Sequence, residues 1–219
     1  MSPHTMTLYT PAHFRTDDRA AIAELIRDHP FATLVTPDAS EPTVSHLPLL
    51  WEPGDGTDGM LVGHCARANP HWQRAQGRES IAIFHGPHAY VSPSWYAEPA
   101  KAVPTWNYAS VHVHGVLEVI DDATAKRRVL DTLVQRFEGS RDTPWTFSMP
   151  ARERDAMLAA IVAFQLRVTR LDAKFKLSQN RSRRDREGVI AGLAAEPYAD
   201  AHATADWMRR HALAGDGGT

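Results

Sequence analysis

A run of aromatic, amide, hydroxyl and imidazole groups at residues 103–115 carries the side chains best suited to bind a ligand. From residue 111 the run alternates, so apolar side chains share one face and polar groups share the other. The polar face presents Tyr108, His112, His114 and Glu118. Such a strand suits the wall of a ligand site, although an ordinary half-buried antiparallel strand has the same pattern.

The start of this run, Thr105, Trp106 and Asn107, offers ring stacking and hydrogen bonding together. A tryptophan can stack on a planar ligand, and an asparagine amide can donate and accept at once. Packing at an interface between subunits would explain the same residues.

Two other segments could accept an anion. Asn69 and Pro70 predict the N-cap and first residue of a short helix that carries Trp72, and a helix N-terminus attracts negative charge. Arg67 could add a bidentate contact to a phosphate or carboxylate. A plain helix cap with Arg67 in solvent is the alternative. The second segment is the polar turn formed by Lys176, Ser178, Gln179 and Asn180.

The elements that must position these groups are short strands with helices inserted between them and added after them. Apolar periodicity, caps and turn residues predict strands at 31–36, 43–51, 60–64, 80–85 with 88–92, 105–120 and 163–171. They predict helices at 16–29, 122–138, 151–162, 182–195 and 200–211. Close spacing of the first strands favours antiparallel hairpins. The predicted class is therefore α+β, an antiparallel β-barrel with inserted and appended helices.

Composition narrows the function classes. The chain has 219 residues, of which 43% are hydrophobic and 23% charged, and its net charge is −2. These values predict one globular domain without a global electrostatic attraction to DNA. No apolar run approaches the roughly 20 residues that span a bilayer, and no signal peptide is visible. The single cysteine, Cys65, fits a cytoplasmic protein.

Four segments in register, residues 63–72, 86–96, 103–115 and 176–181, resemble the PaiB-type family of FMN-binding negative transcriptional regulators. The resemblance runs from about residue 9 to 193. It implies a split β-barrel of the FMN-binding type, a homodimer, and an FMN pocket at the dimer interface. The implied domains are a split barrel at 1–175, a helical extension packed on it at 176–212 and a disordered tail at 213–219.

The resemblance also implies which residues contact FMN. Ser45, His46 and Leu47 would lie along the isoalloxazine ring, and the turn from Lys176 to Asn180 would close over the pocket. The full implied set is Ser45, His46, Leu47, His64, Arg67, Asn69, Trp72, Thr105, Trp106, Asn107, Lys176, Ser178, Gln179 and Asn180. Loop aromatics at Trp95, Tyr96, Trp106 and Trp145 agree with a homodimer, because a monomer rarely exposes so many.

Three functions stay open from sequence. The first is a flavin-dependent regulator or oxidoreductase, with its substrate unknown. The second resembles a haem-dependent piperazate synthase, which closes an N–N bond in a hydroxylated ornithine, with haem b bound by His64 as the axial ligand. His64 could equally be a structural histidine. The third is a cofactor-free DNA-bound repressor, for which Arg181, Arg183, Arg184 and Arg186 are the only candidate phosphate contacts and a solvated charge cluster is the simpler interpretation.

Overall fold

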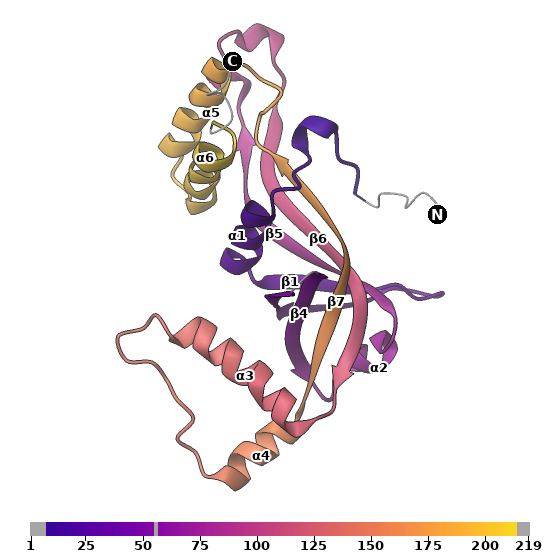
Figure 1. The fold of residues 1–219 in the computed structure, drawn as a ribbon. Coiled ribbons are helices and arrows are strands. Elements are labelled where there is room, and N and C mark those ends of the chain that lie inside the picture. Colours follow the sequence, from indigo (N-terminus) through magenta and orange to yellow (C-terminus); the bar gives the residue numbers. More distant parts are fainter. Residues whose placement is uncertain (1–7, 55–56, 214–219) are drawn as a thin grey trace. The chain divides into compact units, whose positions relative to one another are not determined.

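One antiparallel sheet organises the computed structural model, which describes residues 8–54 and 57–213 (Figure 1). Its strand order is β2-β1-β5-β6-β7-β4-β3. The bounds are β1 Phe31–Thr36, β2 Thr43–Pro48, β3 Leu50–Gly54, β4 Thr57–Ala66, β5 Glu79–Val91, β6 Thr105–Ile120 and β7 Ile161–Lys176. The helices are α1 Arg19–Asp28, α2 His71–Ala75, α3 Ala123–Glu138, α4 Ala151–Ala159, α5 Arg183–Ala195 and α6 Ala199–His211.

The chain divides into two units, and β5, β6 and β7 contribute residues to both. Unit 1 contains the residues up to His29, residues 85–111 and those from Asp172 onward. Unit 2 contains residues 30–84 and 112–171. The domain boundary predicted at residue 175 stays a prediction, and residues 214–219 of the predicted tail lie outside the described residues.

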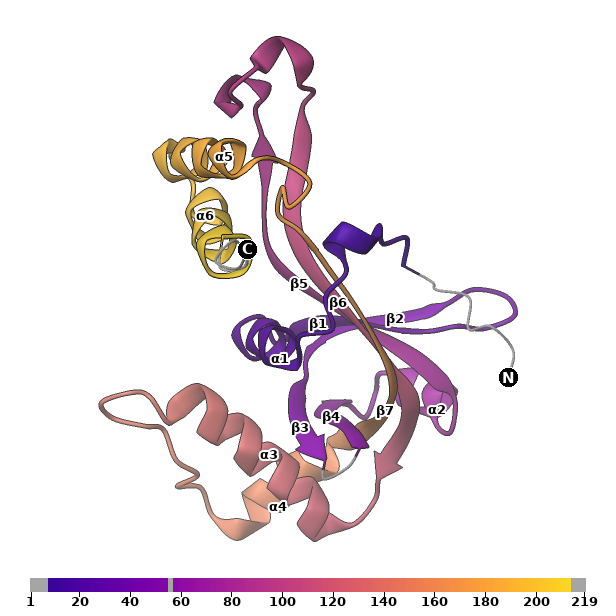
Figure 2. The ribbon, with the colours of Figure 1, turned by 45° about the horizontal axis from the view of Figure 1, so that its top comes forward.

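In unit 2, an antiparallel hairpin joins β1 to β2, and β4 pairs with β3 on one side and β7 on the other. Figure 2 shows the hairpin and the two helices α3 and α4. Helix α3 begins because the Asp122 side chain accepts from the Ala125 N–H at 2.7 Å. Its apolar side packs on β4, in a cluster of Leu50, Val62, Val129, Leu133 and Ala163.

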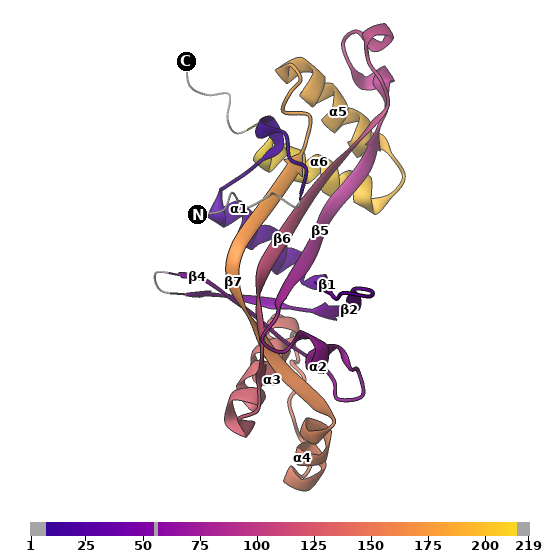
Figure 3. The ribbon, with the colours of Figure 1, turned by 90° about the vertical axis from the view of Figure 1, so that its right-hand side faces the viewer.

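In unit 1, the helices α5 and α6 pack against each other, as Figure 3 also shows. The Ser182 side chain accepts from the Asp185 N–H at 3.1 Å and so caps α5. Trp207 of α6 is fully buried and meets Phe175 edge to face at a centroid distance of 5.7 Å.

The differences from the predicted elements are local. The strand predicted at 43–51 is interrupted after Pro48, and the N–H of Leu49 donates to the Pro30 carbonyl instead of continuing the ladder. Proline has no N–H, which explains a break at this position. Helix α1 is capped by Asp18 rather than by Thr16. Strand β5 runs unbroken through residues 79–91, and β7 extends to Lys176.

No helix among the described residues is long and apolar enough to cross a bilayer.

Candidate functional site

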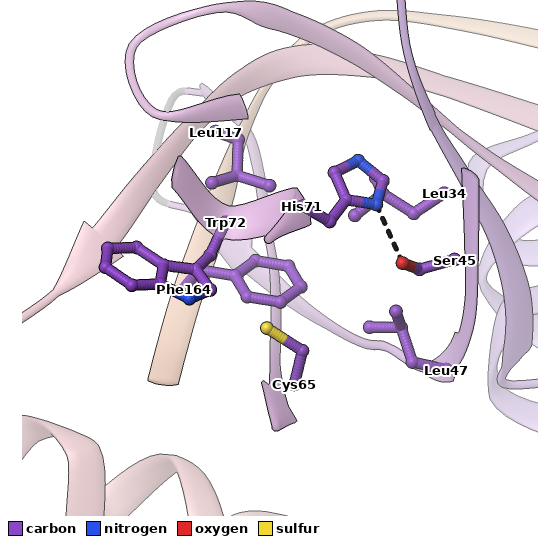
Figure 4. A pocket seen from close by; sticks show the side chains of 8 residues that line it. All are labelled: Leu34, Ser45, Leu47, Cys65, His71, Trp72, Leu117 and Phe164. Atoms are coloured by element: carbon purple, nitrogen blue, oxygen red, sulfur yellow. Dashed lines mark hydrogen bonds between the residues drawn. The ribbon is translucent and has the colours of Figure 1, made fainter. Parts of the chain in front are cut away.

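A small hollow in unit 2 brings together two of the predicted segments. Figure 4 shows His71 and Ser45 bonded to each other on one side of it, with the Trp72 and Phe164 rings and the Cys65 sulfur on the other. The hollow is shallow and narrow: its space is about 180 Å³ with open solvent included, and none of it admits a water molecule. It is lined by Leu34, Ser45, Leu47, Cys65, His71, Trp72, Leu117 and Phe164.

A buried chain of hydrogen bonds supports the polar side of this hollow. The Ser45 hydroxyl lies 2.8 Å from His71 Nδ1 and accepts from the Asn69 side-chain amide at 2.9 Å. His71 Nε2 lies 2.9 Å from the Thr36 hydroxyl, which is 2.6 Å from the Ser80 hydroxyl. Because both imidazole nitrogens have partners, the His71 ring is held in one orientation.

Burial decides the charge states around the hollow. It lowers the pKa of His71, and the nearby Arg74 charge lowers it further. Burial raises the pKa of the Cys65 thiol. A neutral imidazole and a protonated thiol therefore line the hollow near neutral pH, which suits binding of a neutral ring system better than nucleophilic attack by Cys65.

The β2 strand presents its three predicted site residues to two different sides. Ser45 and Leu47 are buried and line the hollow. His46 is exposed, and its Nδ1 lies 3.1 Å from the Thr33 hydroxyl, with its ring stacked against Phe31. Alternation along a strand accounts for this separation.

The helix at the predicted anion site, α2, is short. The helix begins at His71, has five residues, and has no side-chain cap at Pro70. The Asn69 side chain nevertheless accepts from the His71 N–H at 3.0 Å, so it satisfies a backbone donor in the first turn of the helix. The Trp72 indole donates to the Arg67 carbonyl at 3.1 Å and thereby fixes the connection before the helix.

Arg67 has a structural role that its sequence position did not reveal. Its guanidinium donates to the carbonyls of Ala159 at 2.6 Å and Ile161 at 3.1 Å, at the end of α4 and the start of β7. Cations favour the C-terminal end of a helix, where carbonyls lack partners. A contact between Arg67 and a cofactor phosphate stays a prediction, and it would have to use the remaining N–H groups.

His64 lies on the opposite face of β4 from Cys65 and the hollow, since neighbouring strand residues alternate. It pairs with Ala163 of β7 in the sheet. Its Nδ1 is buried and has no hydrogen-bond partner among the described residues, and burial lowers the pKa of the ring. Buried polar atoms normally have a hydrogen-bond partner, so the fold by itself does not explain this nitrogen.

In unit 1 the other two predicted segments meet. The Asn107 amide donates to the Ser178 hydroxyl at 2.9 Å and approaches Met208 Sδ at 3.3 Å. Lys176 Nζ donates to the Thr105 hydroxyl at 2.6 Å and to the Trp106 carbonyl. The fold therefore brings these two segments together, and the polar groups of Asn107 and Ser178 satisfy each other; their contact with a cofactor stays a prediction.

The remaining residues of the turn differ in exposure. The Gln179 side chain accepts from the Leu177 N–H at 2.7 Å and donates to the Phe175 carbonyl, so it holds the turn closed. Asn180 is exposed. Ser178 has a φ of 65°, in the left-handed region, which a non-glycine residue adopts only when its surroundings hold it there.

Sequence reasoning did not single out His71, Thr36 and Ser80. His71 stands inside the recognised segment 63–72, but its partners Thr36 and Ser45 come from the β1–β2 hairpin. The only sequence signal was a histidine at the first turn of a helix, beside a residue already predicted to bind cofactor.

The sheet order defines a class, the split-barrel proteins. Two solved structures show the fold: the FAD and haem binding protein from Mycobacterium smegmatis and the flavocytochrome Anf3 from Azotobacter vinelandii. The first has a TM-score of 0.59 and 22% identity, covering 81% of this chain and 80% of that one. The second has a TM-score of 0.58 and 16% identity, covering 74% of this chain and 69% of that one.

The chain belongs to the family described as "Putative FMN-binding domain", whose model matches residues 8–170. It is 34% identical over 205 residues to the protease synthase and sporulation protein PAI 2 of Bacillus subtilis, covering 92% of this chain and 96% of the relative. It is also 32% identical to an uncharacterised protein of Emericella nidulans, covering 78% of this chain and 84% of the relative. The predicted fold and the FMN cofactor are thereby confirmed.

The residues at the hollow fit part of an FMN molecule. Hydroxyl, amide and imidazole groups beside Leu47 and Trp72 match a ring that is apolar on its faces and polar at its edges. The hollow by itself cannot hold the ring, because the space between its side chains does not admit even a water molecule, whereas sites for ligands of this size measure roughly 300–1,000 Å³. Ser45, Leu47, Asn69 and Trp72 can therefore supply one wall, and further surface must complete the pocket.

Proposed function

We propose that this protein is a homodimer in which a second copy completes the FMN pocket, and that it acts as a flavin-dependent regulator or oxidoreductase. The observation that carries the proposal is a well-formed polar and aromatic wall around a hollow of only about 180 Å³. Bound FMN would supply electron transfer, while the chain's own residues bind and orient the ring. The small-molecule substrate is unknown, and a cytoplasmic location rests on the single cysteine.

A dimer is expected in solution. Trp106 is 52% exposed and Trp145 is 48% exposed, which agrees with surfaces that a partner covers. Tyr96, in contrast, is buried beneath Arg181 and gives no support to this argument. Light scattering at micromolar concentration should give about twice the chain mass of 24.3 kDa. A mass close to that of one chain would remove the dimer from the proposal.

A haem-dependent enzyme of the piperazate synthase type is the second candidate, favoured by one observation. The buried Nδ1 of His64 has no hydrogen-bond partner among the described residues, as expected if this nitrogen binds the haem iron. The Mycobacterium smegmatis relative of this fold is named for haem as well as FAD.

Parallel reconstitution with FMN and haem separates the two candidates. We expect stoichiometric FMN uptake, measured by flavin absorbance and fluorescence, with no intense Soret band. His64→Ala should then weaken FMN by no more than about 0.5–1.5 kcal/mol, the range for one lost hydrogen bond. Exposed His85 gives the control variant His85→Ala. Haem uptake that His64→Ala abolishes, without FMN binding, would establish the second candidate instead.

Direct DNA binding has little support. Two of the four arginines near the start of α5 are engaged locally: Arg181 lies over the Tyr96 ring at 4.9 Å, and Arg183 pairs with Glu187 at 2.9 Å. A regulatory role would therefore act through the cofactor or a partner protein rather than through this arginine cluster.

A further inference from the structure

Lys174 places its ammonium in an unusual environment on β7. The residue is only 7% exposed. Its Nζ donates to the Tyr9 carbonyl at 2.8 Å and lies 5.4 Å from the ring centroids of both Tyr9 and Tyr108. Aromatic faces stabilise a cation only partly, so most of the cost of burying this charge is not offset by these contacts.

Lys176 lies two residues further along the same strand face and is half-buried. Its Nζ donates to the Thr105 hydroxyl at 2.6 Å and to the Trp106 carbonyl, and it lies 5.7 Å from the Phe14 ring centroid. The Cα atoms of Lys174 and Lys176 lie about 6.6 Å apart, the distance that two residues span along a strand. The two ammonium groups therefore share one wall of unit 1.

No carboxylate neutralises this pair among the described residues. The ion pairs found between described residues include neither Lys174 nor Lys176. The pKa of Lys176 is lowered, first by burial and then by the positive charges of Lys174 and Arg181. Buried charges are normally paired, so a counter-charge is missing from this wall.

The donors that remain match an oxyanion. An ammonium has three N–H donors. Lys174 uses one of them and Lys176 uses two, which leaves two and one, respectively. We infer that Lys174 and Lys176 together bind a carboxylate or phosphate group, walled by the rings of Tyr9, Phe14 and Tyr108. Two sources can supply this oxyanion: the phosphate of FMN itself, or a separate small molecule.

The sequence makes a direct test possible, because the chain has only four lysines: Lys101, Lys126, Lys174 and Lys176. In protein labelled with [15N]lysine, the Nζ resonances of all four can be followed by NMR during titration with inorganic phosphate. We expect the Lys174 and Lys176 signals to move and the lowered pKa of Lys176 to rise. Lys101, exposed and paired with Glu98, should stay unchanged and serves as internal control. Equal movement of all four signals, or of none, would overturn the inference.

Thermal unfolding distinguishes an anion site from a structural lysine. Phosphate should raise the unfolding midpoint of the wild type and of Lys101→Met, because it binds the folded state. Lys174→Met removes an unpaired buried charge, so its midpoint without phosphate should be equal to or above that of the wild type, and phosphate should not raise it. If Lys174→Met instead lowers the midpoint equally with and without phosphate, Lys174 only holds Tyr9 in place and the inference fails.

Comparison of FMN with riboflavin identifies the source of the oxyanion. If FMN moves the two lysine signals, riboflavin does not, and Lys176→Met weakens FMN at least tenfold, the site holds the cofactor phosphate. If phosphate and acetate move the signals while FMN still binds, the site holds a separate small molecule. Both results support the oxyanion site. The phosphate titration uses flavin-free protein, so its outcome is independent of whether the proposed flavin function is correct.

Discussion

Replacing His71 with alanine is expected to lower the free energy of unfolding by about 2–4 kcal/mol. The change removes a fully buried ring, leaves a cavity beside Trp72, and deprives the Ser45 and Thr36 hydroxyls of one partner each. Urea denaturation followed by circular dichroism measures the loss. FMN affinity should fall as well, because Ser45 and Asn69 would no longer be held in position.

His46→Ala is the matched control for this variant. His46 neighbours Ser45 but is exposed and contacts only Thr33 and Phe31. A surface substitution of this kind usually changes stability by less than about 0.5 kcal/mol. If the two alanine variants were equally stable, the buried chain of hydrogen bonds would have no structural importance.

The same residue makes stability depend on pH in a known direction. Burial lowers the pKa of His71, and also those of His29 and His64, so the unfolded chain binds protons at a higher pH than the folded protein does. Their contribution to stability is complete above the ordinary histidine pKa of about 6.5 and declines as the pH falls below it. In the His71→Ala variant, the free energy of unfolding should therefore decrease less as the pH falls.

Replacing Asn107 with alanine is the second large effect that we expect, again about 2–4 kcal/mol of unfolding free energy. Asn107 is fully buried, and its amide joins Ser178 to Met208 of α6. Its loss would leave the Ser178 hydroxyl without this partner and release a residue held at a φ of 65°. Thermal and urea unfolding measure the change.

Asn180→Ala is the control, because Asn180 belongs to the same turn but is exposed. FMN titration of both variants, under conditions where both are folded, adds a second measurement. If Asn107 acts only by positioning the turn, FMN affinity should fall in Asn107→Ala in parallel with stability. Stability equal to that of Asn180→Ala would contradict the role assigned to Asn107.

Local sequence determined much of the secondary structure of this protein. Alternation predicted the bounds of β1 and β6 correctly, and α3 and α5 begin one residue after their predicted starts. These features depend on interactions within a few residues, so their signals are present in short segments. The recognised segments were also sufficient to predict the split barrel and FMN.

Only the tertiary structure decided what the polar residues do. His71 was passed over because its partners Ser45 and Thr36 are 26 and 35 residues away. Arg67 has a side chain of the type that commonly binds phosphate, yet it donates to a carbonyl 92 residues away. The sequence shows which donors and acceptors a side chain carries. It does not show which groups they bond, because the sheet order brings strands together that are distant in the sequence.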